Sequence, residues 1–277
     1  MGHDLTGKVA LVTGGARGQG RSHALALAAA GATVVVCDIA ADIPTVYYPL
    51  GTAAELDDTV AAITAAGGVG RGLVVDVRDS AQVNQAIDQI VAEFGTIDIL
   101  VANAGISGYA PFGEMTDEAW ADMIGTNLTG VFNCIRAVIA PMRRQGYGRV
   151  VAIASGSGRT GMRNLAHYAA SKWGVIGLVK SVALETATDG ITVNVVCPST
   201  VRTPMIENEA TARLFCPELE HPTFEDAEPR FAALTPMGKP WLQPEDITRA
   251  VMYLIEDPGV TTGSVVEVNL GTSANRT

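Results

Sequence analysis

The sequence predicts an α/β fold: a single doubly wound domain over residues 1–277, with a seven-stranded parallel sheet and helices on both faces. Three observations support this prediction. Short β-prone runs alternate with longer helical stretches, which is the order that builds a parallel sheet. The first apolar run leads directly into a glycine cluster and then into a helix. Hydrophobic residues make up 48% of the chain, which is enough for a sizeable core.

Composition and charge exclude several classes of function. The formal net charge of -10 argues against nucleic acid or an anionic membrane as a partner, because both require a basic surface. No apolar run approaches 18 residues, so we expect no membrane span, and Met1–Asp4 lacks the features of a signal peptide. The cysteines show no metal-ligand spacing, so no metal is expected, and Cys37, Cys134 and Cys197 lie in apolar segments that should bury them. These features indicate a soluble, cytoplasmic protein.

The first strand, turn and helix have the pattern of a phosphate-binding unit. Lys8–Thr13 is predicted to be a buried parallel strand. The cluster Thr13–Gly20 follows with the spacing G-x-x-x-G-x-G, and an Ala/Leu-rich helix then runs to Ala30, with Gly31 as its cap. Glycines let the backbone approach a pyrophosphate, and the helix N-terminus supplies N–H donors and a positive dipole. We assign to cofactor binding Gly14, Arg17, Gly18, Gln19 and Gly20.

The second strand ends at an acid that discriminates between cofactors. Thr33–Cys37 is the strand, and Asp38 follows it, 18 residues after Gly20. Strand, glycine turn, helix, strand and acid is the order of a dinucleotide-binding βαβ unit. The Asp38 carboxylate can accept hydrogen bonds from the adenosine ribose hydroxyls, and its charge would repel a 2′-phosphate. The sequence therefore predicts NAD rather than NADP.

An unusual segment follows Asp38. Such connections commonly run about 2–6 residues, but here the 13 residues Ile39–Gly51 precede a helix that begins with the capping box Thr52-x-x-Glu55. The segment carries two prolines and two adjacent tyrosines, Tyr47 and Tyr48. Two interpretations remain open. It is either a surface insertion that packs on itself or a cover over the adenosine half of the cofactor, since it leaves the strand that ends at Asp38.

The rest of the chain continues the alternation of helices and strands. Helices are expected at Thr52–Ala66, Asp79–Phe94, Thr116–Arg144, Asn164–Ala187 and Pro244–Glu256. Strands are expected at Leu73–Val77, Ile97–Val101, Arg149–Ala154, Ile191–Val196 and Ser264–Val268. The stretch 204–240 has weak periodicity, which is typical of a mobile lid or substrate loop. Asp76 and Val77 are assigned to the cofactor, with Asp76 placed to bond the adenine amino group.

Tyr168 and Lys172 form a candidate acid/base pair. Residues four apart share one face of a helix, so the two side chains should point into the same space. The unperturbed pKa of a tyrosine is about 10, and a nearby ammonium lowers it by favouring the phenolate. The pair can then give and take a proton near neutral pH. By itself this spacing also fits a solvated helix face.

Taken together, these motifs resemble the short-chain dehydrogenase/reductase family over nearly the full length of the chain. Thr13–Gly20 matches the family's T-G-x-x-x-G-x-G, and the run Asn103, Ala104 and Gly105 matches its N-A-G, which supports the sheet beside the adenine. The segment that holds the nicotinamide amide, P-G-x-V-x-T, is matched by Pro198, Val201 and Thr203, with Ser199 in place of glycine. The resemblance implies a Rossmann-type fold, nicotinamide chemistry and a homotetramer.

The same resemblance assigns the catalytic roles. The family's catalytic Asn, Ser, Tyr and Lys match Asn127, Ser155, Tyr168 and Lys172. Tyr168 would take the alcohol proton while hydride moves to the nicotinamide, and Lys172 would lower the pKa of Tyr168 and bond the nicotinamide ribose. Ser155 would orient the reacting oxygen, and Asn127 would hold a water that relays protons from Lys172. In isolation, Ser155 also fits a hydroxyl bound to its own loop, and Asn127 a residue that satisfies a backbone carbonyl.

A finer resemblance concerns the glycine turn and the segment after Asp38. Most family members carry an aliphatic residue where Gln19 stands. The glycine-turn sequence with Gln19, together with the Ile39–Gly51 segment, resembles the sequences of a subgroup related to carveol dehydrogenase. That subgroup is associated with the peptide-derived redox carrier mycofactocin and with permanently bound NAD. The resemblance implies that Ile39–Gly51 buries the cofactor and that reducing equivalents leave through an external carrier.

Three functions remain open. The first is an NAD-dependent dehydrogenase that acts on a hydrophobic secondary alcohol, terpenoid or otherwise cyclic. The second is a carbonyl reductase of 3-oxoacyl thioesters, which Asp38 and the acidic 204–240 stretch disfavour. The third is a non-catalytic NAD sensor, which the intact Ser155, Tyr168 and Lys172 disfavour. We expect the substrate pocket to be walled by Ile106–Pro111, Arg159–Asn164 and residues 204–240.

Overall fold

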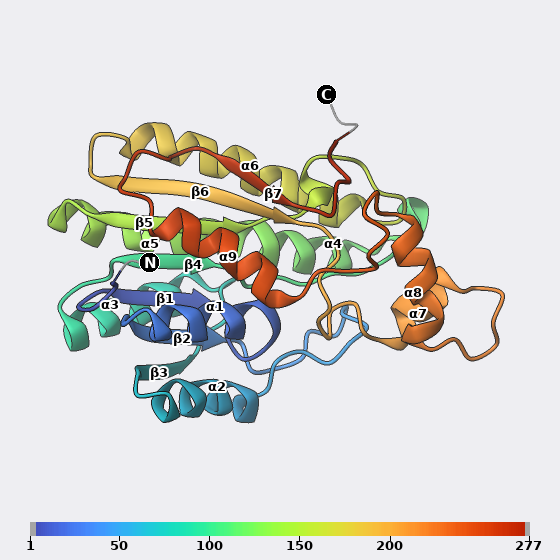
Figure 1. Ribbon diagram of the computed structural model, residues 1–277, viewed down its shortest axis with the longest axis horizontal. Helices are drawn as coiled ribbons and strands as arrows, with labels where there is room; N and C mark the ends of the chain where they lie inside the picture. The colour runs from blue at the N-terminus through green and yellow to red at the C-terminus, as the bar shows by residue number, and fades with distance from the viewer. Residues whose placement is uncertain (1–3, 275–277) are drawn as a thin grey trace.

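One seven-stranded sheet runs through the protein, in the order β3-β2-β1-β4-β5-β6-β7. The computed structural model describes residues 4–274, so Met1–His3 of the expected amino-terminal stretch lie outside it. Every strand pairing in the sheet is parallel. Helices lie on both faces of the sheet (Figure 1). The predicted α/β, doubly wound fold class is therefore confirmed.

The elements follow the predicted alternation. The first half comprises β1 (Val9–Thr13), α1 (Gly18–Ala29), β2 (Thr33–Asp38), α2 (Ala53–Ala65), β3 (Val69–Val74) and α3 (Ser80–Phe94). The middle comprises β4 (Ile99–Ala102), η1 (Phe112–Glu114), α4 (Asp117–Ile124), η2 (Gly125–Thr129), α5 (Gly130–Gln145), β5 (Gly148–Ile153), η3 (Gly156–Gly158) and α6 (Ala166–Thr186). The last part comprises β6 (Ile191–Pro198), α7 (Glu209–Phe215), α8 (Phe224–Ala233), α9 (Pro244–Ile255) and β7 (Val265–Val268).

Two apolar cores hold the layers together, one on each face of the sheet. On one face, buried side chains of α3, α5 and α6 pack against the strands, including Ile90, Ile135 and Val179. On the other face, α1, α2 and α9 do the same, including Leu27 and Ile63. The chain crosses between the halves of the sheet after β3, so β1 and β4 are neighbours. Ligands of such sheets bind outside the carboxyl ends of the strands at this switch point.

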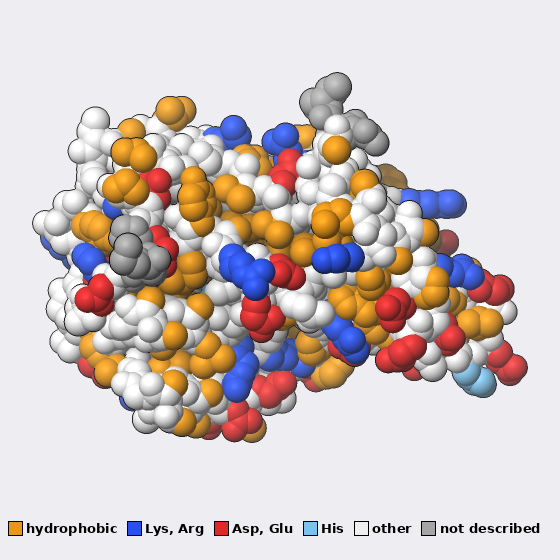
Figure 2. Space-filling view, in the orientation of Figure 1, with side chains coloured by type: hydrophobic (Ala, Val, Ile, Leu, Met, Phe, Trp, Pro, Cys, Tyr) orange, Lys and Arg blue, Asp and Glu red, His pale blue; other side chains and the backbone are white. Residues whose placement is uncertain are grey.

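Three predicted elements differ from the structure. The third strand ends at Val74 rather than Val77, because β3 is the sheet edge and its pairing with β2 ends at Asp38 and Val74. The predicted helix Thr116–Arg144 is divided by η2, a π-helical turn in which the Gly130 N–H bonds the Gly125 carbonyl, five residues back. The stretch 204–240, whose weak periodicity predicted a mobile lid or substrate loop, contains the helices α7 and α8. Acidic side chains gather over these two helices, at the right of Figure 2.

The stretch Asp117–Gln145, which contains α4, η2 and α5, is long and apolar enough to cross a membrane by length and composition alone. The sequence expectation had excluded such a run. Half of its most apolar window is buried inside the protein, and Val131, Ile135 and Val138 of α5 belong to the core beneath the sheet. It packs as a core helix of the α/β fold.

Candidate active site

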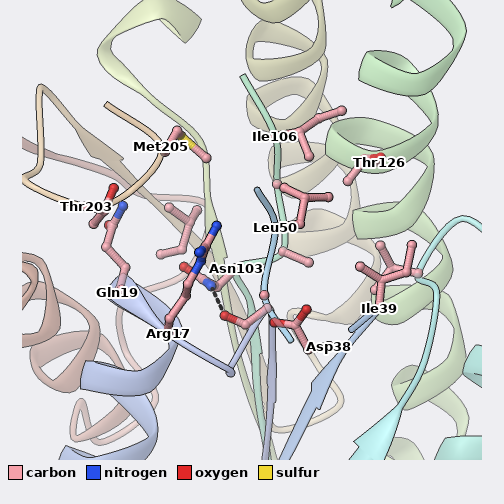
Figure 3. A pocket seen from close by; sticks show the side chains of 18 of the residues that line it. Arg17, Gln19, Asp38, Ile39, Leu50, Asn103, Ile106, Thr126, Thr203 and Met205 are labelled. Atoms are coloured by element: carbon pink, nitrogen blue, oxygen red, sulfur yellow. Dashed lines mark hydrogen bonds between the residues drawn. The ribbon is translucent and has the colours of Figure 1, made fainter. Parts of the chain in front are cut away.

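A cavity opens at the carboxyl ends of the central strands and holds about 1040 Å³ of space between protein atoms, the solvent at its mouth included. Most of the predicted cofactor residues line it, from the glycine turn, the strand ends and α6. They are Gly14, Arg17, Gly18, Gln19, Gly20, Asp38, Asp76, Val77, Asn103, Ala104, Gly105, Tyr168, Lys172 and Thr203. Figure 3 shows side chains from several of these elements around the same space. The structure therefore brings the predicted cofactor residues together, with two exceptions.

The exceptions lie behind the cavity wall. Pro198 is the last residue of β6, and Val201 is buried and pairs with Leu242. Thr203 does reach the cavity, where its Cγ2 lies 3.3 Å from the position that a side chain on Gly18 would occupy. The segment from Pro198 to Thr203 thus lies beside the glycine turn, and only its end faces the cavity.

The glycine turn is closely packed, which explains its composition. A Cβ at Gly20 would lie 2.0 Å from the Gly14 carbonyl oxygen, and one at Gly14, whose φ is +65°, would lie 2.8 Å from Ala104 Cα. Asn103 Nδ2 donates to the carbonyls of Thr13 and Gly14 at 2.9 and 3.2 Å. The helix α1 starts beside the cavity with no side-chain cap. Its first N–H groups are therefore left for a ligand, as a pyrophosphate site requires.

Asp38 lies where β2 meets the cavity. Its side chain is 9% exposed, and Oδ2 accepts a hydrogen bond from the Ala16 N–H at 3.2 Å. Oδ1 accepts from the Ala40 N–H at 3.3 Å and lies 3.0 Å from where a Cβ on Gly51 would be. Each oxygen keeps further acceptor capacity toward the cavity, because a carboxylate has about four acceptor sites.

The Ile39–Gly51 segment lies against the body of the protein and lines the cavity with Ile43, Tyr48 and Leu50. These three side chains form a buried cluster with Ile106 and Met123, and Tyr168 packs against its edge. Of the two interpretations of the segment, its position supports the cover. The cluster extends to Tyr168, so the segment reaches farther than the adenosine half that the sequence suggested.

Hydrogen bonds fix the segment at several points. Tyr48 Oη accepts from the Ser107 N–H at 3.1 Å, and Tyr47 Oη donates to the Tyr109 carbonyl at 3.1 Å. The Arg17 guanidinium donates to the Pro49 carbonyl and lies 3.8 Å from the Glu55 carboxylate. Arg17 therefore joins the glycine turn to the segment, a role that the sequence did not suggest.

Tyr168 and Lys172 share a face of α6 and both line the cavity, as the spacing predicted. Lys172 Nζ donates to the Ile153 carbonyl at 2.9 Å and lies 5.6 Å from the centre of the Tyr168 ring. Burial lowers the pKa of Lys172 to about 8. Burial also raises the pKa of Tyr168 to about 12, although a hydrogen bond with Ser155 acts in the opposite direction. The pKa of Tyr168 therefore moves upward rather than in the expected downward direction, because the loss of solvent outweighs the hydrogen bond with Ser155.

Ser155 and Asn127 do not line the cavity themselves, but each contacts a residue that does. Ser155 Oγ accepts from the Ser157 N–H at 3.1 Å, so it both binds its own loop and contacts Tyr168. Asn127 is fully buried in η2, and its amide exchanges hydrogen bonds of 2.8 and 2.9 Å with the backbone of Ile106. Asn127 Oδ1 and Lys172 Nζ also approach the same side of Gly105. The amide therefore satisfies backbone groups while it lies beside Lys172.

Two polar atoms in the cavity wall support a polar ligand there. Among residues 4–274, Gln19 Oε1 and Thr126 Oγ1 are buried without a hydrogen-bond partner, and both residues line the cavity. Buried polar groups are normally paired, so a bound dinucleotide fits these positions. The sequence identified Gln19 but not Thr126, which lies next to Asn127 without a motif of its own. Within the described part of the chain, no three His, Cys, Asp or Glu side chains cluster as metal ligands.

Comparisons with known proteins agree with this geometry. The family described as short chain dehydrogenase matches residues 8–213. The (-)-trans-carveol dehydrogenase of Rhodococcus erythropolis is 40% identical over 273 residues, with 97% of this chain and 98% of that protein covered. An NAD-dependent oxidoreductase of Mycobacterium tuberculosis is 39% identical over 273 residues, with coverages of 98% and 97%.

A solved structure gives the same result. Carveol dehydrogenase from Mycobacterium avium, in complex with NAD, superposes with a TM-score of 0.96 at 37% identity, covering 99% of this chain and 100% of that one. The match extends over the sheet, both helix layers and the segments around the cavity. The chain belongs to the short-chain dehydrogenase/reductase family of oxidoreductases.

Proposed function

We propose that this protein is an NAD-dependent dehydrogenase that interconverts a hydrophobic secondary alcohol and its ketone, with a terpenoid or other cyclic compound as substrate. The observation that carries the proposal is the convergence of Tyr168 and Lys172 on the cavity that the glycine turn and Asp38 also line. A proton donor, a cofactor cradle and an acid that selects the cofactor share one space. Two relatives carry the name carveol dehydrogenase, and carveol is a cyclic alcohol of this class.

NAD fits the site better than NADP. The Asp38 carboxylate lies at the end of β2, against Gly51, and is nearly buried. A 2′-phosphate there would meet a like charge at low dielectric, which is strongly unfavourable. Ribose hydroxyls would instead donate to the free acceptor sites of Asp38. The same charge disfavours a carbonyl reductase that uses NADP, and the exposed acids of α7 and α8 disfavour docking of an acidic acyl carrier.

Each catalytic side chain has a separate task in this proposal. NAD, when bound, supplies the hydride acceptor. Tyr168 Oη takes the proton of the alcohol hydroxyl, and Ser155 Oγ, already in contact with Tyr168, orients the substrate oxygen. Lys172 would bond the nicotinamide ribose and pass the proton onward, and Asn127 would position the water that receives it. The apolar side chains Ile106 and Met205 beside Tyr168 select a hydrophobic substrate.

The NAD stays bound between turnovers in this proposal, and an external carrier such as mycofactocin removes the reducing equivalents. The contacts of Tyr48, Tyr47 and Arg17 support this, because all of them must break before Ile39–Gly51 can move aside. We also propose a cytoplasmic homotetramer. Exposed Phe132 and Trp173, 40% and 51% accessible, lie on α5 and α6, whose outer faces would pack between subunits.

A purified sample tests the function directly. We expect an NAD absorbance that survives dialysis, no turnover with added NAD as the electron sink, and turnover of cyclic secondary alcohols with an artificial electron acceptor. Ready exchange with free NAD would reject the resident cofactor while leaving the dehydrogenase. Bound NAD with no redox activity across a broad alcohol panel would instead identify a sensor. Light scattering tests the tetramer.

A further inference from the structure

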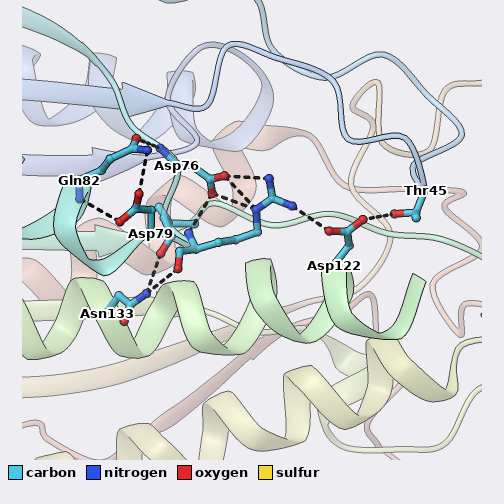
Figure 4. A network of polar contacts seen from close by, with 8 residues as sticks. Thr45, Asp76, Asp79, Gln82, Asp122 and Asn133 are labelled. Carbon is cyan, nitrogen blue, oxygen red and sulfur yellow. Dashed lines mark hydrogen bonds and ion pairs between the residues drawn. The ribbon is translucent and has the colours of Figure 1, made fainter. Parts of the chain in front are cut away.

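A continuous chain of polar contacts joins the middle of the Ile39–Gly51 segment to the wall of the cofactor cavity. Thr45 Oγ1 donates to Asp122 Oδ2 at 2.8 Å, and Arg78 Nη1 donates to Asp122 Oδ1 at 2.8 Å. Arg78 Nε and Nη2 donate to the two oxygens of Asp76 at 2.8 to 3.0 Å. Figure 4 shows the chain running from Asp76 across to the loop of Thr45. We call these four residues, Thr45, Asp122, Arg78 and Asp76, the Arg78 strut.

One end of the strut is rigidly held. Asn133 of α5 donates to the Val77 carbonyl at 2.9 Å, and the Asp76 N–H donates to Gln82 Oε1 at 3.0 Å. A Cβ at Gly130 would lie 2.5 Å from Val77, so α5 also packs directly on this loop. The loop between β3 and α3 is therefore fastened to two helices. Thr45, on a segment without regular structure, is the end of the strut that can detach.

The contacts within the strut pair its charged side chains with one another, so the Asp76 carboxylate has little acceptor capacity left for another ligand. Asp76 already receives the Arg78 backbone N–H at 2.9 Å as well as the guanidinium, which occupies about all four acceptor sites of a carboxylate. The adenine contact predicted for Asp76 therefore competes with Arg78. Arg78 is held between two carboxylates, and Asp76 and Asp122 raise its pKa, so the guanidinium stays charged.

We propose that the Arg78 strut fastens the Ile39–Gly51 segment over the cofactor cavity and thereby sets how slowly the dinucleotide leaves. This inference rests on the proposed NAD site. Neither Arg78 nor Asp122 lines the cavity, so both act as positioning residues through Thr45. The Tyr48 and Tyr47 contacts join the segment to the loop at 107–109, whereas Thr45 ties it to helix α4. Opening the segment requires this bond to break, and a hydrogen bond to a carboxylate is among the stronger ones.

The Thr45→Val variant removes the hydroxyl and keeps the shape of the side chain. Holoenzyme with its resident NAD is mixed with excess radiolabelled NAD, and incorporation of label gives the exchange rate. We expect exchange to be roughly tenfold faster than in the wild type, the effect of one lost hydrogen bond to a charged group. Asp122→Asn, which also weakens the Arg78 contact, should exchange at least as fast. Thr64→Val is the matched control, because Thr64 bonds only the Val60 carbonyl within α2.

Ionic strength provides a readout that a purely structural role would not produce. The side chains of Arg78, Asp76 and Asp122 are 31%, 22% and 24% exposed, so salt reaches the ion pairs. Raising the salt should speed exchange in the wild type more than in Asp122→Asn. Exchange of Thr45→Val and Asp122→Asn at the wild-type rate would overturn the strut. Rapid exchange in the wild type itself would reject the resident cofactor, and the ratio of variant to wild-type rates would still decide for or against the strut.

Discussion

Two segments extend from the sheet around the cavity, and they are fastened in opposite ways. Ile39–Gly51 contains no helix or strand, yet its middle is tied to the body through Thr45 and Tyr48. Residues 204–240 contain α7 and α8, which surround a small aromatic core of their own with Phe224, Phe231 and neighbouring Trp241. Contacts with the rest of the protein hold Ile39–Gly51 in place, whereas 204–240 has a small hydrophobic core of its own.

The backbone attachments of 204–240 lie toward its ends, and Thr211 of α7 also contacts Tyr109. Val201 pairs with Leu242, so the two points where the chain leaves and returns lie side by side. Arg202 strengthens this junction, since its guanidinium lies 5.3 Å from the Trp241 ring centre and 2.7 Å from Glu207. A segment clasped at its ends can move as a unit without losing its core. We expect such a segment to serve an exchanging substrate, and the segment tied through its middle to serve a resident cofactor.

The largest effect should come from Tyr168, which both segments surround. Tyr168→Phe removes the only proposed proton acceptor for the alcohol and should lower kcat by about 10²- to 10⁴-fold. Bound NAD should be retained, because the ring still fills its place in the cluster with Tyr48 and Ile106. Steady-state assays with an artificial electron acceptor and a nucleotide assay after denaturation check both points. Activity near the wild-type level would remove Tyr168 from the mechanism.

Truncation of Tyr48 tests the segment that is tied through its middle. Tyr48 is 7% exposed and packs against Ile43, Leu50 and Ile106. Tyr48→Ala should lower the free energy of unfolding by about 3 kcal/mol, and NAD exchange should become about 10²-fold faster if most of that loss falls on the closed segment. Tyr253→Ala, at an exposed site on α9, is the control. A destabilised protein that keeps its NAD as tightly as before would show that the segment does not retain the cofactor.

The pH dependence tests the environment that the two segments create around Tyr168. Burial raises the pKa of Tyr168 to about 12, so the phenolate fraction rises about tenfold per pH unit below that value. Alcohol oxidation needs the phenolate and should accelerate with pH across the neutral range. Ketone reduction needs the protonated phenol and should stay flat over the same range. Measuring both directions separates these slopes, and equal slopes would exclude Tyr168 as the titrating group.

The smallest effect should come from the junction at the ends of 204–240, where Arg202 contacts Trp241 and Glu207. Arg202→Met removes an ion pair whose side chains are 41% and 39% exposed, and exposed pairs contribute only about 0–1 kcal/mol. We expect KM for the alcohol to rise a few-fold with kcat and NAD exchange unchanged. Arg213→Met, which breaks an exposed pair with Glu209 on α7, is the control. Faster NAD exchange in Arg202→Met would contradict the division of roles between the two segments.

The sequence predicted the parts of the fold that local rules determine. The order of strands and helices, the glycine turn and the capping box of Thr52 and Glu55 all follow from short-range patterns, and the structure contains them. Short-range patterns did not predict the helices within 204–240, because α7 and α8 are short and pack on an aromatic core that is shared between them and Trp241. The end of β3 at Val74 depends on its pairing with β2, which periodicity does not reveal.

The site shows the same division. The cofactor residues of the cavity wall were found mostly from motifs, whereas the Arg78 strut joins residues 45, 76, 78 and 122, which no motif connects. The direction of the Tyr168 pKa was missed for a related reason. The spacing shows that Lys172 lies near Tyr168, but the burial that raises the pKa of Tyr168 comes from elements packed on α6. Pairing is visible in a sequence, and desolvation is not.

The wide turn η2 has a consequence for chain length. In an ordinary α-helix each residue adds about 100° of rotation, and η2 holds a hydrogen bond that spans five residues instead of four. Because such a turn holds one residue more than a regular turn, deletion of one residue within Gly125–Thr129 would restore regular helix and leave α4 and α5 close to their present orientation. The side chains inside the turn would change direction instead. Asn127 would lose its place against the Ile106 backbone and beside Lys172, so the extra residue of η2 serves the site rather than the packing of the two helices.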